Sequence, residues 1–508
     1  MKKFDVTIIG AGHNGLIAAC YLAKAGLRVG VLEANSSVGG ATVSQKVFPD
    51  FEARLSRYSY LVSLMPDQIF SDLDLKFETI GREISSYTPE IVDGKDTGLL
   101  VYRSPESSTI TSFTELAGSH SFTAWQDFYA RVQKIADAMA PTMLQKLPTR
   151  SELKARVGDS IWEEIVERPL GESLEKNFEN DLIRGVVLTD GLIGTFSDAH
   201  DIAANRCFIY HLIGNGTGEW RVPRGGMGGL IAELLAKATD LGVEIFTNHP
   251  ATSLKRESNQ WITATASKTF ESRFVLSACA PQVLARLLGT TPPQSLDGSQ
   301  VKINMLLKKL PRLKSGVDPR IAFAGTFHFD ERYSDLQKAF AQAQAGQVPD
   351  RIPAEMYCHT LTDNSILSDE LNSQGYHTLT LFGIHTPASL FEKNEPAVKA
   401  EIVQKLFAQL NRYLVDPIEE CFAVASDGSL CYEIKSPLEL EKEIALPRGN
   451  IFHKDLSMPF REDNQPASWG VETEYPNLFI SGAGAIRGGG VSGIPGHNAA
   501  RAVLEALG

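Results

Sequence analysis

Residues 4–40 constrain the fold more than any other stretch, because they have the order strand, glycine-rich turn, helix and strand. The apolar run Val6–Ile9 leads into the turn Gly10-Ala11-Gly12-His13-Asn14-Gly15. A helical pattern of small and apolar residues follows the turn. A second apolar run, Val29–Leu32, then ends at Glu33. The pattern predicts one βαβ unit, in which a helix connects two parallel strands.

Each glycine of this turn has a physical role in binding a dinucleotide. Gly10 permits a sharp turn, Gly12 lets backbone N–H groups approach a pyrophosphate, and Gly15 lets helix and strand pack closely. The helix N-terminus then presents partial positive charge to the phosphates. Glu33 is placed to accept hydrogen bonds from an adenosine ribose, and its charge disfavours the 2′-phosphate of NADP. Gly39-Gly40 predicts a further backbone approach to the pyrophosphate and resembles the extended fingerprint of FAD-binding proteins.

Length and charge limit the possible partners. The 508 residues predict two or three domains with a large core. The formal net charge of −12 argues against a nucleic-acid partner and offers no basic patch to anionic lipid. The six cysteines form no CxxC pair, so we expect free thiols and a cytoplasmic protein. The sequence has no apolar run of about 18 residues, so we expect no membrane-spanning helix and leave peripheral membrane contact open.

Two more glycine-rich segments lead into predicted helices. Gly225–Gly229 precedes a helical pattern over 230–241, and a hairpin pattern follows at 261–276. Near the end, an apolar strand leads through a glycine-dense crossing, 482–493, into another helix. Glycines are costly to order. Close approach of the backbone to a large ligand is the simplest reason for so many.

Residues 66–222 differ in composition from the βαβ unit and predict a separate lobe inserted into the nucleotide-binding fold, with helix-length patterns at 122–139 and 151–167. Further along, 301–307 is a strand-like run and 397–413 a helix-length pattern. The histidines between 356 and 385 match no zinc spacing, so we expect no metal site.

The three glycine-rich turns together resemble those of the FAD-dependent amine oxidase and phytoene desaturase superfamily, and the resemblance covers essentially the whole chain. Several motifs resemble one branch more narrowly, which contains carotene-ketolase-type enzymes and pyridine nucleotide-disulphide oxidoreductase domain-containing protein 2. These motifs are GAGHNG, Gly39-Gly40-Ala41, Arg224-Gly-Gly-Met-Gly, Gly449-Asn-Ile-Phe-His453 and the terminal GGGVSGIPGHNAA. The resemblance implies an α/β fold with a Rossmann-like FAD-binding domain of the glutathione-reductase-like, amine-oxidase type and an interleaved α+β substrate domain.

The same resemblance implies that both domains are discontinuous. The FAD-binding domain is expected to combine 1–75, 224–290 and 445–508. The substrate-binding domain is expected to combine 76–223 and 291–444.

The resemblance also assigns residues to a non-covalently bound FAD. It implies that Glu33 binds the adenosine ribose, Ala251 the adenine, Gly482 to Gly484 the ribityl phosphate end, and Gly490 to Ser492 the flavin. The implied cofactor-binding residues are Gly10, Ala11, Gly12, Asn14, Gly15, Glu33, Ala34, Gly40, Ala41, Thr42, Gly226, Met227, Ala251, Gly482, Ala483, Gly484, Gly490, Val491 and Ser492.

Two departures from the superfamily pattern affect these expectations. Many relatives have an acid where this chain has Ala483, so ribityl recognition must differ or depend on backbone groups. The GGGVSG turn contains no cysteine, which argues against the covalent flavin link of some amine oxidases.

These features predict an FAD-dependent oxidoreductase of the desaturase, dehydrogenase or isomerase kind, which transfers a hydride between flavin N5 and a hydrophobic, isoprenoid-like or polyene-like substrate. His211 and His453 are the candidate proton acceptors, because histidine can titrate near neutral pH. Asp190 and Arg206 are weaker candidates. One alternative is an amine oxidase-type flavoenzyme, which needs a cage of aromatic residues facing the flavin. Another is a flavin-bound regulatory protein with little catalysis.

Overall fold

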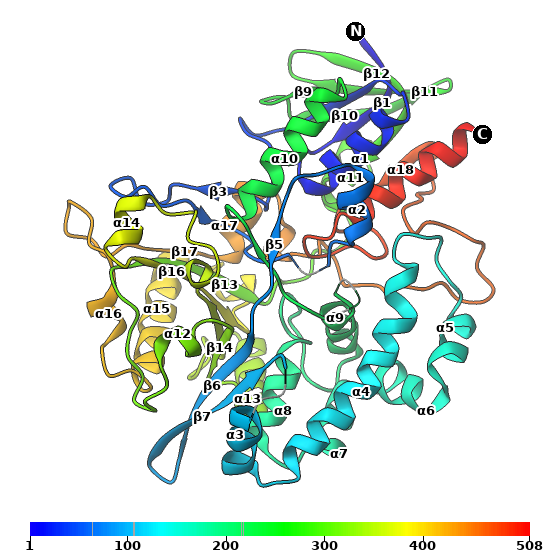
Figure 1. The fold of residues 1–508 in the computed structure, drawn as a ribbon. Helices are drawn as coiled ribbons and strands as arrows, with labels where there is room; N and C mark the ends of the chain where they lie inside the picture. The colour runs from blue at the N-terminus through cyan, green and yellow to red at the C-terminus, as the bar shows by residue number, and fades with distance from the viewer. Residues whose placement is uncertain (63, 105–106, 215, 217) are drawn as a thin grey trace.

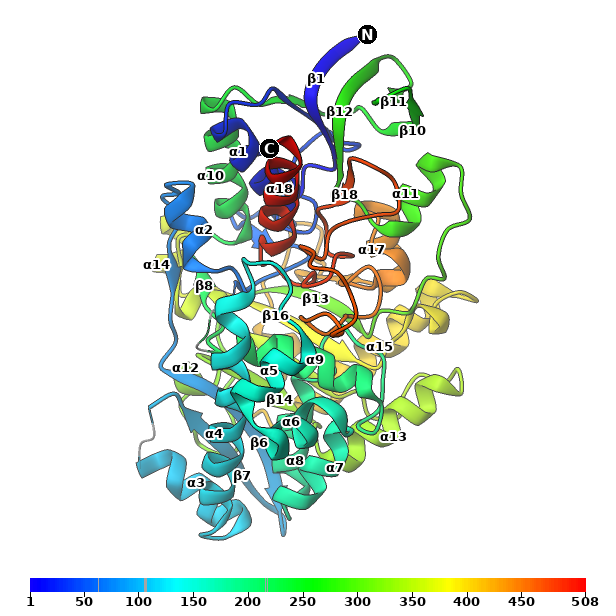
Figure 2. The same cartoon turned by 90° about the vertical axis from the view of Figure 1, so that its right-hand side faces the viewer.

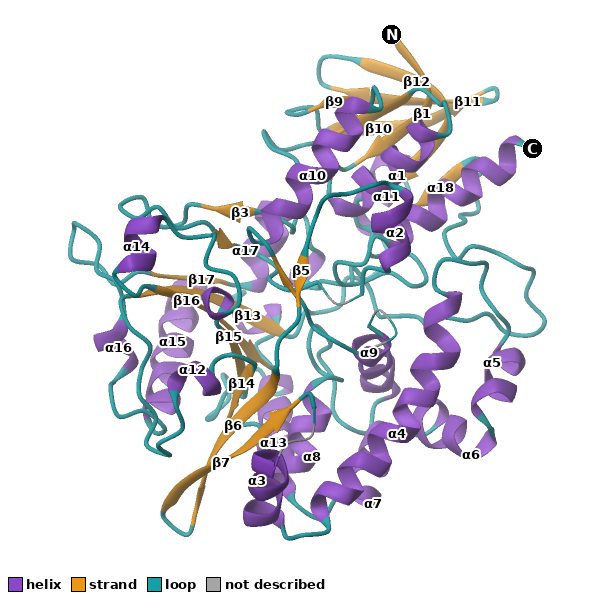
Figure 3. Cartoon of the chain, in the orientation of Figure 1, coloured by secondary structure: helices purple, strands orange, loops and turns teal. Residues whose placement is uncertain are grey.

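Most strands of the molecule belong to two large sheets, and a mostly helical region lies beside the second one (Figure 1, Figure 3). The computed structural model describes residues 1–62, 64–104, 107–214, 216 and 218–508. The first sheet is at the top of Figure 1, close to both chain ends.

The first sheet contains the predicted βαβ unit. Its strand order is β10-β11-β12-β1-β2-β9, and β18 also pairs with β12. Strands β1, β2, β9, β12 and β18 are parallel, whereas β10 and β11 are antiparallel. The strands are β1 (Lys2–Ile9), β2 (Val29–Leu32), β9 (Glu244–Phe246), β10 (Ala251–Glu257), β11 (Gln260–Thr265), β12 (Thr269–Ser277) and β18 (Leu478–Ile480). The α/β, Rossmann-like fold class predicted from the sequence is confirmed.

Three helices pack together beside this sheet, and each follows one of the predicted glycine-rich turns (Figure 2). They are α1 (His13–Lys24), α10 (Met227–Asp240) and α18 (Ile494–Leu507). Helix α1 packs against both of the others. Ala18 and Ala19 of α1, and Ala499 and Ala500 of α18, are fully buried, because small side chains let the helix axes approach closely. Helices α2 (Asp67–Asp72) and α11 (Pro281–Leu288) complete this region.

The second sheet also has seven strands, in the order β17-β13-β16-β15-β14-β6-β7. Neighbouring strands are antiparallel except β14 and β6, which are parallel. The strands are β6 (Ile84–Val92), β7 (Lys95–Tyr102), β13 (Gln300–Leu307), β14 (Thr326–Phe329), β15 (Ala354–Tyr357), β16 (His377–Ile384) and β17 (Tyr432–Lys435).

Helices pack against both faces of the second sheet. On one face, α15 (Glu395–Asn411) shares a core with the inward-facing residues of β13, β14 and β15. On the other side lies the helical region, whose core includes Leu99 and Val101 of β7. The helices of this region are α3 (Ser107–Ala117), α4 (Ser121–Met139), α5 (Arg150–Val157), α6 (Asp159–Trp162), α7 (Leu170–Asn177), α8 (Asp181–Thr189), α9 (Ile202–Ile213) and α13 (Tyr333–Gln344).

The structure differs from the sequence pattern at 151–167, where one continuous helix-length stretch was expected. Helix α5 ends before Gly158, which has φ 93° and ψ 145°. The short helix α6 follows, and Glu163–Glu167 forms a π-helical turn. A left-handed φ is accessible to glycine at little cost, so Gly158 stops the helix although the flanking residues favour it.

Shorter elements connect the two regions. The hairpin of β3 (Ser44–Gln45) and β4 (Leu55–Ser56) lies next to α10, and β5 (Thr79–Ile80) pairs with β8 (Val222–Pro223). The remaining helices are α12 (Pro319–Ala322), α14 (Asp369–Ser373), α16 (Ile418–Cys421) and α17 (Pro437–Ile444). The five-segment division into domains stays a proposal, and β5 and β8 lie close to two of its boundaries. Within the described ranges, no helix combines the length and the apolar character needed to cross a bilayer.

Candidate functional site

A cavity of about 470 Å³ lies between the first sheet and the second. Its wall draws on the ends of β1 and β2, the start of α1, helix α17, and the glycine-dense turn before α18. It therefore brings together segments from the beginning, middle and end of the chain. The predicted cofactor-binding residues in its wall are Gly10, Gly12, Asn14, Gly15, Glu33, Ala34, Gly40, Ala41, Ala251, Ala483, Gly490 and Val491.

The turn from β1 into α1 has the geometry expected of a phosphate-binding turn. Gly10 has φ +102°, and a Cβ on Gly15 would lie 2.1 Å from the Gly10 carbonyl oxygen. Gly12 is the N-cap residue of α1 and has no side chain to cap the helix, and the first turn contains no acidic residue. The first amides of α1 and the positive end of its dipole therefore face the cavity, where an anion is favoured.

Glu33 is fixed at the end of β2 by two backbone hydrogen bonds. Its side chain is buried, and its Oε2 accepts a hydrogen bond from the Ala11 N–H at 2.9 Å. Its Oε1 accepts one from the Asn35 N–H, also at 2.9 Å. Each carboxylate oxygen keeps a second lone pair, so Glu33 can still accept hydrogen bonds from ribose hydroxyls.

Five of the predicted cofactor-binding residues lie just behind the wall of the cavity. Ala11 orients Glu33, and Thr42 Oγ1 is 3.0 Å from His13 Nδ1. Gly482 packs so closely on Ala278 that a Cβ would lie 2.6 Å from its carbonyl oxygen. The other two, Gly484 and Ser492, flank the wall residues Ala483 and Val491.

Gly226 and Met227 lie elsewhere. They begin α10, where the Met227 N–H donates to Ser56 Oγ at 3.0 Å and a Cβ on Gly226 would meet Ser44 Oγ. This glycine-rich turn therefore packs α10 against the β3–β4 hairpin, and neither residue contributes to the cavity wall.

Among the residues that the structure describes, three buried polar atoms of the cavity lining have no hydrogen-bond partner. They are Asn14 Oδ1, His13 Nε2 and His453 Nδ1. Buried polar groups are rarely left unpaired, so they indicate a ligand with hydrogen-bonding groups of its own. Together with the exposed amides of α1 and the free acceptor positions of Glu33, they fit a dinucleotide such as FAD.

Both candidate histidines line the cavity, but their electrostatics differ from the expectation. Burial lowers the pKa of His211 to about 3 and that of His453 to about 4. The expectation that they titrate near neutral pH is therefore wrong. Burial removes the water that would solvate an imidazolium and so destabilises the charged form. Both side chains are neutral at pH 7. The ring of His211 stacks on Trp220 with a centroid distance of 4.3 Å.

The two weaker candidates lie outside this cavity. Asp190 lines a second cavity of about 350 Å³, and burial raises its pKa to about 7. Arg206 donates to the Leu456 carbonyl at 3.3 Å and lies 3.9 Å from Asp455. The structure therefore places neither beside the predicted flavin site.

The structure adds aromatic residues that the sequence analysis did not assign to the site. Tyr60, Trp220 and Phe382 line the cavity from three distant segments, and the rings of Tyr60 and Phe382 lie 4.9 Å apart. No local pattern marks them, because only the tertiary fold brings them together.

The sequence analysis also did not assign Lys302 to the site, although a lysine inside an apolar strand-like run could have been recognised in the sequence. It is a lysine inside the buried strand β13, is 1% exposed, and donates to the carbonyls of Ser56 and Ser59. Burial lowers its pKa well below the usual value. Since Ser59 lines the cavity, Lys302 holds part of the wall in place.

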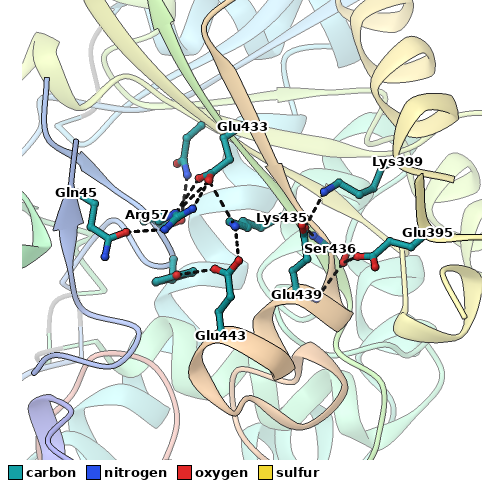
Figure 4. Close-up of polar contacts among 11 residues, drawn as sticks. Gln45, Arg57, Glu395, Lys399, Glu433, Lys435, Ser436, Glu439 and Glu443 are labelled. Carbon is teal, nitrogen blue, oxygen red and sulfur yellow. Dashed lines mark hydrogen bonds and ion pairs between the residues drawn. The ribbon is translucent and has the colours of Figure 1, made fainter. Parts of the chain in front are cut away.

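A network of ion pairs and hydrogen bonds holds helix α17 against β17 (Figure 4), and residues of α17 line the cavity. Glu443 of α17 accepts hydrogen bonds from Lys435 Nζ at 2.5 Å and from Tyr58 Oη at 2.7 Å. Arg57 pairs with Glu433 and donates to Gln45 Oε1 at 2.8 Å. The network thus connects Arg57 and Tyr58, which follow β4, to β17 and α17. Glu443 also lines the cavity, so the network shapes its wall directly.

The cavity can be compared with known proteins now that its geometry is described. A family model described as "Flavin containing amine oxidoreductase" matches residues 98–409. The chain belongs to the flavin-containing amine oxidoreductase family. A second model, "NAD(P)-binding Rossmann-like domain", matches residues 8–68 of this flavin-containing amine oxidoreductase. The family and the Rossmann-like first sheet identify FAD as its cofactor.

Relatives of this flavin-containing amine oxidoreductase match along nearly its whole length. An uncharacterised protein of Mycobacterium tuberculosis is 41% identical over 100% of this chain and 98% of its own. Pyridine nucleotide-disulfide oxidoreductase domain-containing protein 2 of Mus musculus is 28% identical over 99% and 94%. Among solved structures, putrescine oxidase bound to putrescine superposes with a TM-score of 0.60 at 18% identity over 99% of both chains. That likeness confirms the amine-oxidase type of fold.

Two more distant relatives also match from end to end. A limonene dehydrogenase polypeptide of Castellaniella defragrans is 23% identical over 100% of this chain and 96% of its own. Hydroxyneurosporene desaturase of Cereibacter sphaeroides is 22% identical over 99% and 98%.

Proposed function

We propose that this flavin-dependent oxidoreductase acts on a C–H or C=C group of a hydrophobic, isoprenoid-like or polyene-like molecule. The observation that carries the proposal is the apolar wall of the cavity, formed by Leu61, Leu64, Ile193, Ile451, Phe452 and Leu456. Among the described wall residues, the charged ones are Glu33, which follows β2, and Lys442 and Glu443 of α17. They lie outside the apolar wall. Bound FAD supplies the hydride donor or acceptor at N5.

The residues of the apolar wall position a hydrophobic substrate and exclude water. Exclusion of water strengthens every hydrogen bond made inside the cavity. His211 and His453 are uncharged in this environment, so each can accept a hydrogen bond from the substrate, although their low pKa values make both weak bases. Neither adds a charge that would repel an apolar molecule.

The printed names of two relatives support this substrate class. The limonene dehydrogenase polypeptide and hydroxyneurosporene desaturase are named for isoprenoid molecules. A second candidate function is amine oxidation, which the aromatic rings of Tyr60, Trp220 and Phe382 in the cavity wall favour. The solved neighbour putrescine oxidase is named for an amine.

Anaerobic reduction of the bound flavin tests these alternatives. The FAD-loaded protein is mixed without oxygen with a panel of isoprenoid hydrocarbons, polyenes and amines, and the loss of oxidised-flavin absorbance is followed. We expect isoprenoids or polyenes to bleach the flavin. Bleaching by amines alone would favour amine oxidation. If no compound in the panel bleaches it, a regulatory flavoprotein becomes the better explanation.

The His453→Ala variant tests the role of His453 in the cavity. We expect it to slow flavin reduction by about tenfold or more while flavin still binds, because loss of a hydrogen bond that orients the substrate lowers the rate of the chemical step. His249→Ala is the matched control, since His249 lies outside the cavity wall and its Nδ1 contacts the Thr247 carbonyl. A normal single-turnover rate in His453→Ala would remove His453 from the chemistry.

A further inference from the structure

The second cavity of about 350 Å³ adjoins the flavin cavity. It lies between the helical region and the strands β6, β14 and β15 of the second sheet. His211 and Trp220 line both cavities, so their stacked rings form the common wall. The proposed function does not account for this space.

One wall of the second cavity contains a buried carboxyl group, that of Glu355, with an oxygen that accepts no hydrogen bond from any residue that the structure describes. Glu355 of β15 lines the cavity and is 3% exposed. The Tyr357 hydroxyl lies beside its carboxyl group, and among the described residues Glu355 Oε1 has no hydrogen-bond partner. Its neighbours Ala354 and Met356 pack into the core on the other face of the sheet. Side chains alternate along a strand, so Glu355 is directed towards the helical region and the cavity. A buried acceptor left unpaired is costly, which indicates a ligand group that donates to it.

Two other titratable residues line this cavity near Glu355. His328 of β14 alternates in the same way with Phe327 and Phe329 of the opposite core. Its Nδ1 is 2.7 Å from Glu331 Oε2, which also accepts a hydrogen bond from Thr189 Oγ1 at 2.8 Å. Asp190 contributes a further carboxyl group from the end of α8. In the part of the chain that the structure describes, these residues do not form a metal-binding group.

The charges around this cavity select against an ionised ligand. The cavity wall carries the acids Asp190, Glu219 and Glu355 and the bases Arg82, Arg103 and His328. An ionised ligand of either sign would therefore lie near groups of its own sign. Burial raises the pKa of Glu355 to about 8, so this side chain is mostly uncharged at pH 7. A hydroxyl group carries no charge, donates one hydrogen bond and accepts others, and so suits a wall with both donors and an acceptor.

We infer that the second cavity binds a hydroxyl group at one end of the substrate, with Glu355 Oε1 accepting its hydrogen bond, while the apolar remainder of the substrate lies in the flavin cavity. The His211–Trp220 ring pair lines both cavities and therefore lies beside a substrate that extends into both. The inference rests on the proposed function, because it assumes a hydrophobic substrate beside FAD.

Three matched probes test the inference. The FAD-loaded protein is titrated with farnesene, farnesol and farnesylamine, which share an isoprenoid chain and end in a hydrocarbon, a hydroxyl and an amine. Binding is measured by calorimetry and by the change in flavin absorbance, so turnover is not required. We expect farnesol to bind about tenfold more tightly than farnesene, which corresponds to one hydrogen bond to a buried group.

Variants at Glu355 assign the preference to this residue. Glu355→Leu should bring the ratio of farnesol to farnesene affinity close to one, whereas Glu355→Gln keeps an acceptor oxygen and should retain most of it. Glu90→Leu is the control, because Glu90 is a buried acid of the same sheet, paired with Arg332 and outside both cavities. Flavin content and unfolding temperature show whether each variant is folded.

The outcomes separate the inference from the proposed function. Equal binding of farnesol and farnesene, or an unchanged ratio in Glu355→Leu, would overturn the hydroxyl site and leave the hydrophobic substrate class intact. If farnesylamine binds most tightly, the inference is overturned, because the second cavity then prefers a cationic group to a hydroxyl. If no probe binds to the wild-type protein, both the inference and the proposed function fail.

Discussion

Gly15 holds the first turn and the first helix in their relative positions because it lacks a side chain. A Cβ at this position would lie 2.1 Å from the Gly10 carbonyl oxygen, in a turn that also lines the cofactor cavity. Gly496 of α18 makes a similar approach from another helix, where a Cβ would lie 2.2 Å from the Asn14 carbonyl oxygen. Both contacts involve backbone atoms, which cannot move aside as a flexible side chain can.

The variant Gly15→Ala should therefore lose most of its bound FAD. We expect at least a tenfold weaker affinity, because the α1 amides must shift away from the phosphates. Bound flavin per chain, measured after gel filtration, gives the result. Gly242→Asn is the control, since Gly242 also has a left-handed φ, but a Cβ there meets no atom within 4 Å. Equal flavin content in Gly15→Ala and the wild-type protein would contradict the proposed packing.

His211 should make the stability of the protein depend on pH. Its pKa is about 3 in the folded state against 6.5 for the free side chain. Below about pH 6.5 the unfolded chain binds a proton that the folded chain does not, so the stabilising contribution is complete above that pH and is lost as pH falls. One such proton changes the free energy of unfolding by about 1.4 kcal/mol per pH unit.

Comparison of His211→Asn with the wild-type protein isolates this effect. The variant loses packing against Trp220 and should be less stable near pH 7. The difference in free energy of unfolding between the wild-type protein and the variant should decrease by about 2 kcal/mol from about pH 6.5 to pH 5. Only the wild-type protein loses stability over this range through protonation of the unfolded His211. Urea denaturation at each pH gives the values. His120→Asn, at an exposed histidine, should show no such convergence.

At the scale of elements, the sequence predicts best those elements that depend on contacts between residues close together in the chain. It predicts least well the pairings between distant segments. The second strand of the βαβ unit, Val29–Leu32, matches β2 in both bounds, because a buried parallel strand is apolar throughout. Helix α4 begins one residue before the predicted 122–139. The parallel pairing of β14 with β6, by contrast, joins Thr326 to Ser86, and no local pattern encodes contacts between such distant segments.

Helix α17 is the element on which cofactor retention should depend most. Its Glu443 is held by Lys435 and Tyr58, and Lys435 is almost fully buried. The variant Glu443→Gln leaves that buried ammonium with Glu433 at 3.5 Å, a weaker arrangement, so α17 should separate from the cavity more readily.

We expect FAD to dissociate several-fold faster from Glu443→Gln than from the wild-type protein. The rise in flavin fluorescence after rapid dilution into an excess of an FAD-binding apoprotein would give the rate. Glu420→Gln is the control, because Glu420 is an exposed acid on α16, away from the cavity. An unchanged release rate would show that the ion-pair network of Figure 4 does not govern access to the site.

At the scale of the whole molecule, the cofactor cavity is built from segments that are far apart in sequence. The glycine-rich turns at 10–15 and 482–493 meet there. Local strand-turn-helix patterns predict each turn, but their convergence is implied only by the family resemblance. The aromatic residues Tyr60, Trp220 and Phe382 could not be assigned in that way, because their meeting depends on the packing of both sheets. The neutral state of His211 and His453 could not be predicted either, because burial of a side chain cannot be deduced from the sequence alone.

FAD should therefore stabilise the molecule as a whole. A ligand that binds only the folded state at about 100 times its dissociation constant adds about 2.7 kcal/mol. Flavin-free protein should accordingly unfold at a temperature several degrees lower than FAD-loaded protein in differential scanning fluorimetry. NADP is the control ligand, because Glu33 repels its 2′-phosphate. An equal shift with NADP would contradict the role of Glu33.

The pairing of β18 with β12, and of α18 with α1, has a consequence for biosynthesis. Residues 478–507 leave the ribosome after the rest of the two sheets has been translated. Until they emerge, a nascent chain has an unpaired edge along the second half of β12 and lacks the last glycine-dense turn of the cavity. Loading of the cofactor is therefore a late event, which completes folding after translation has reached this segment.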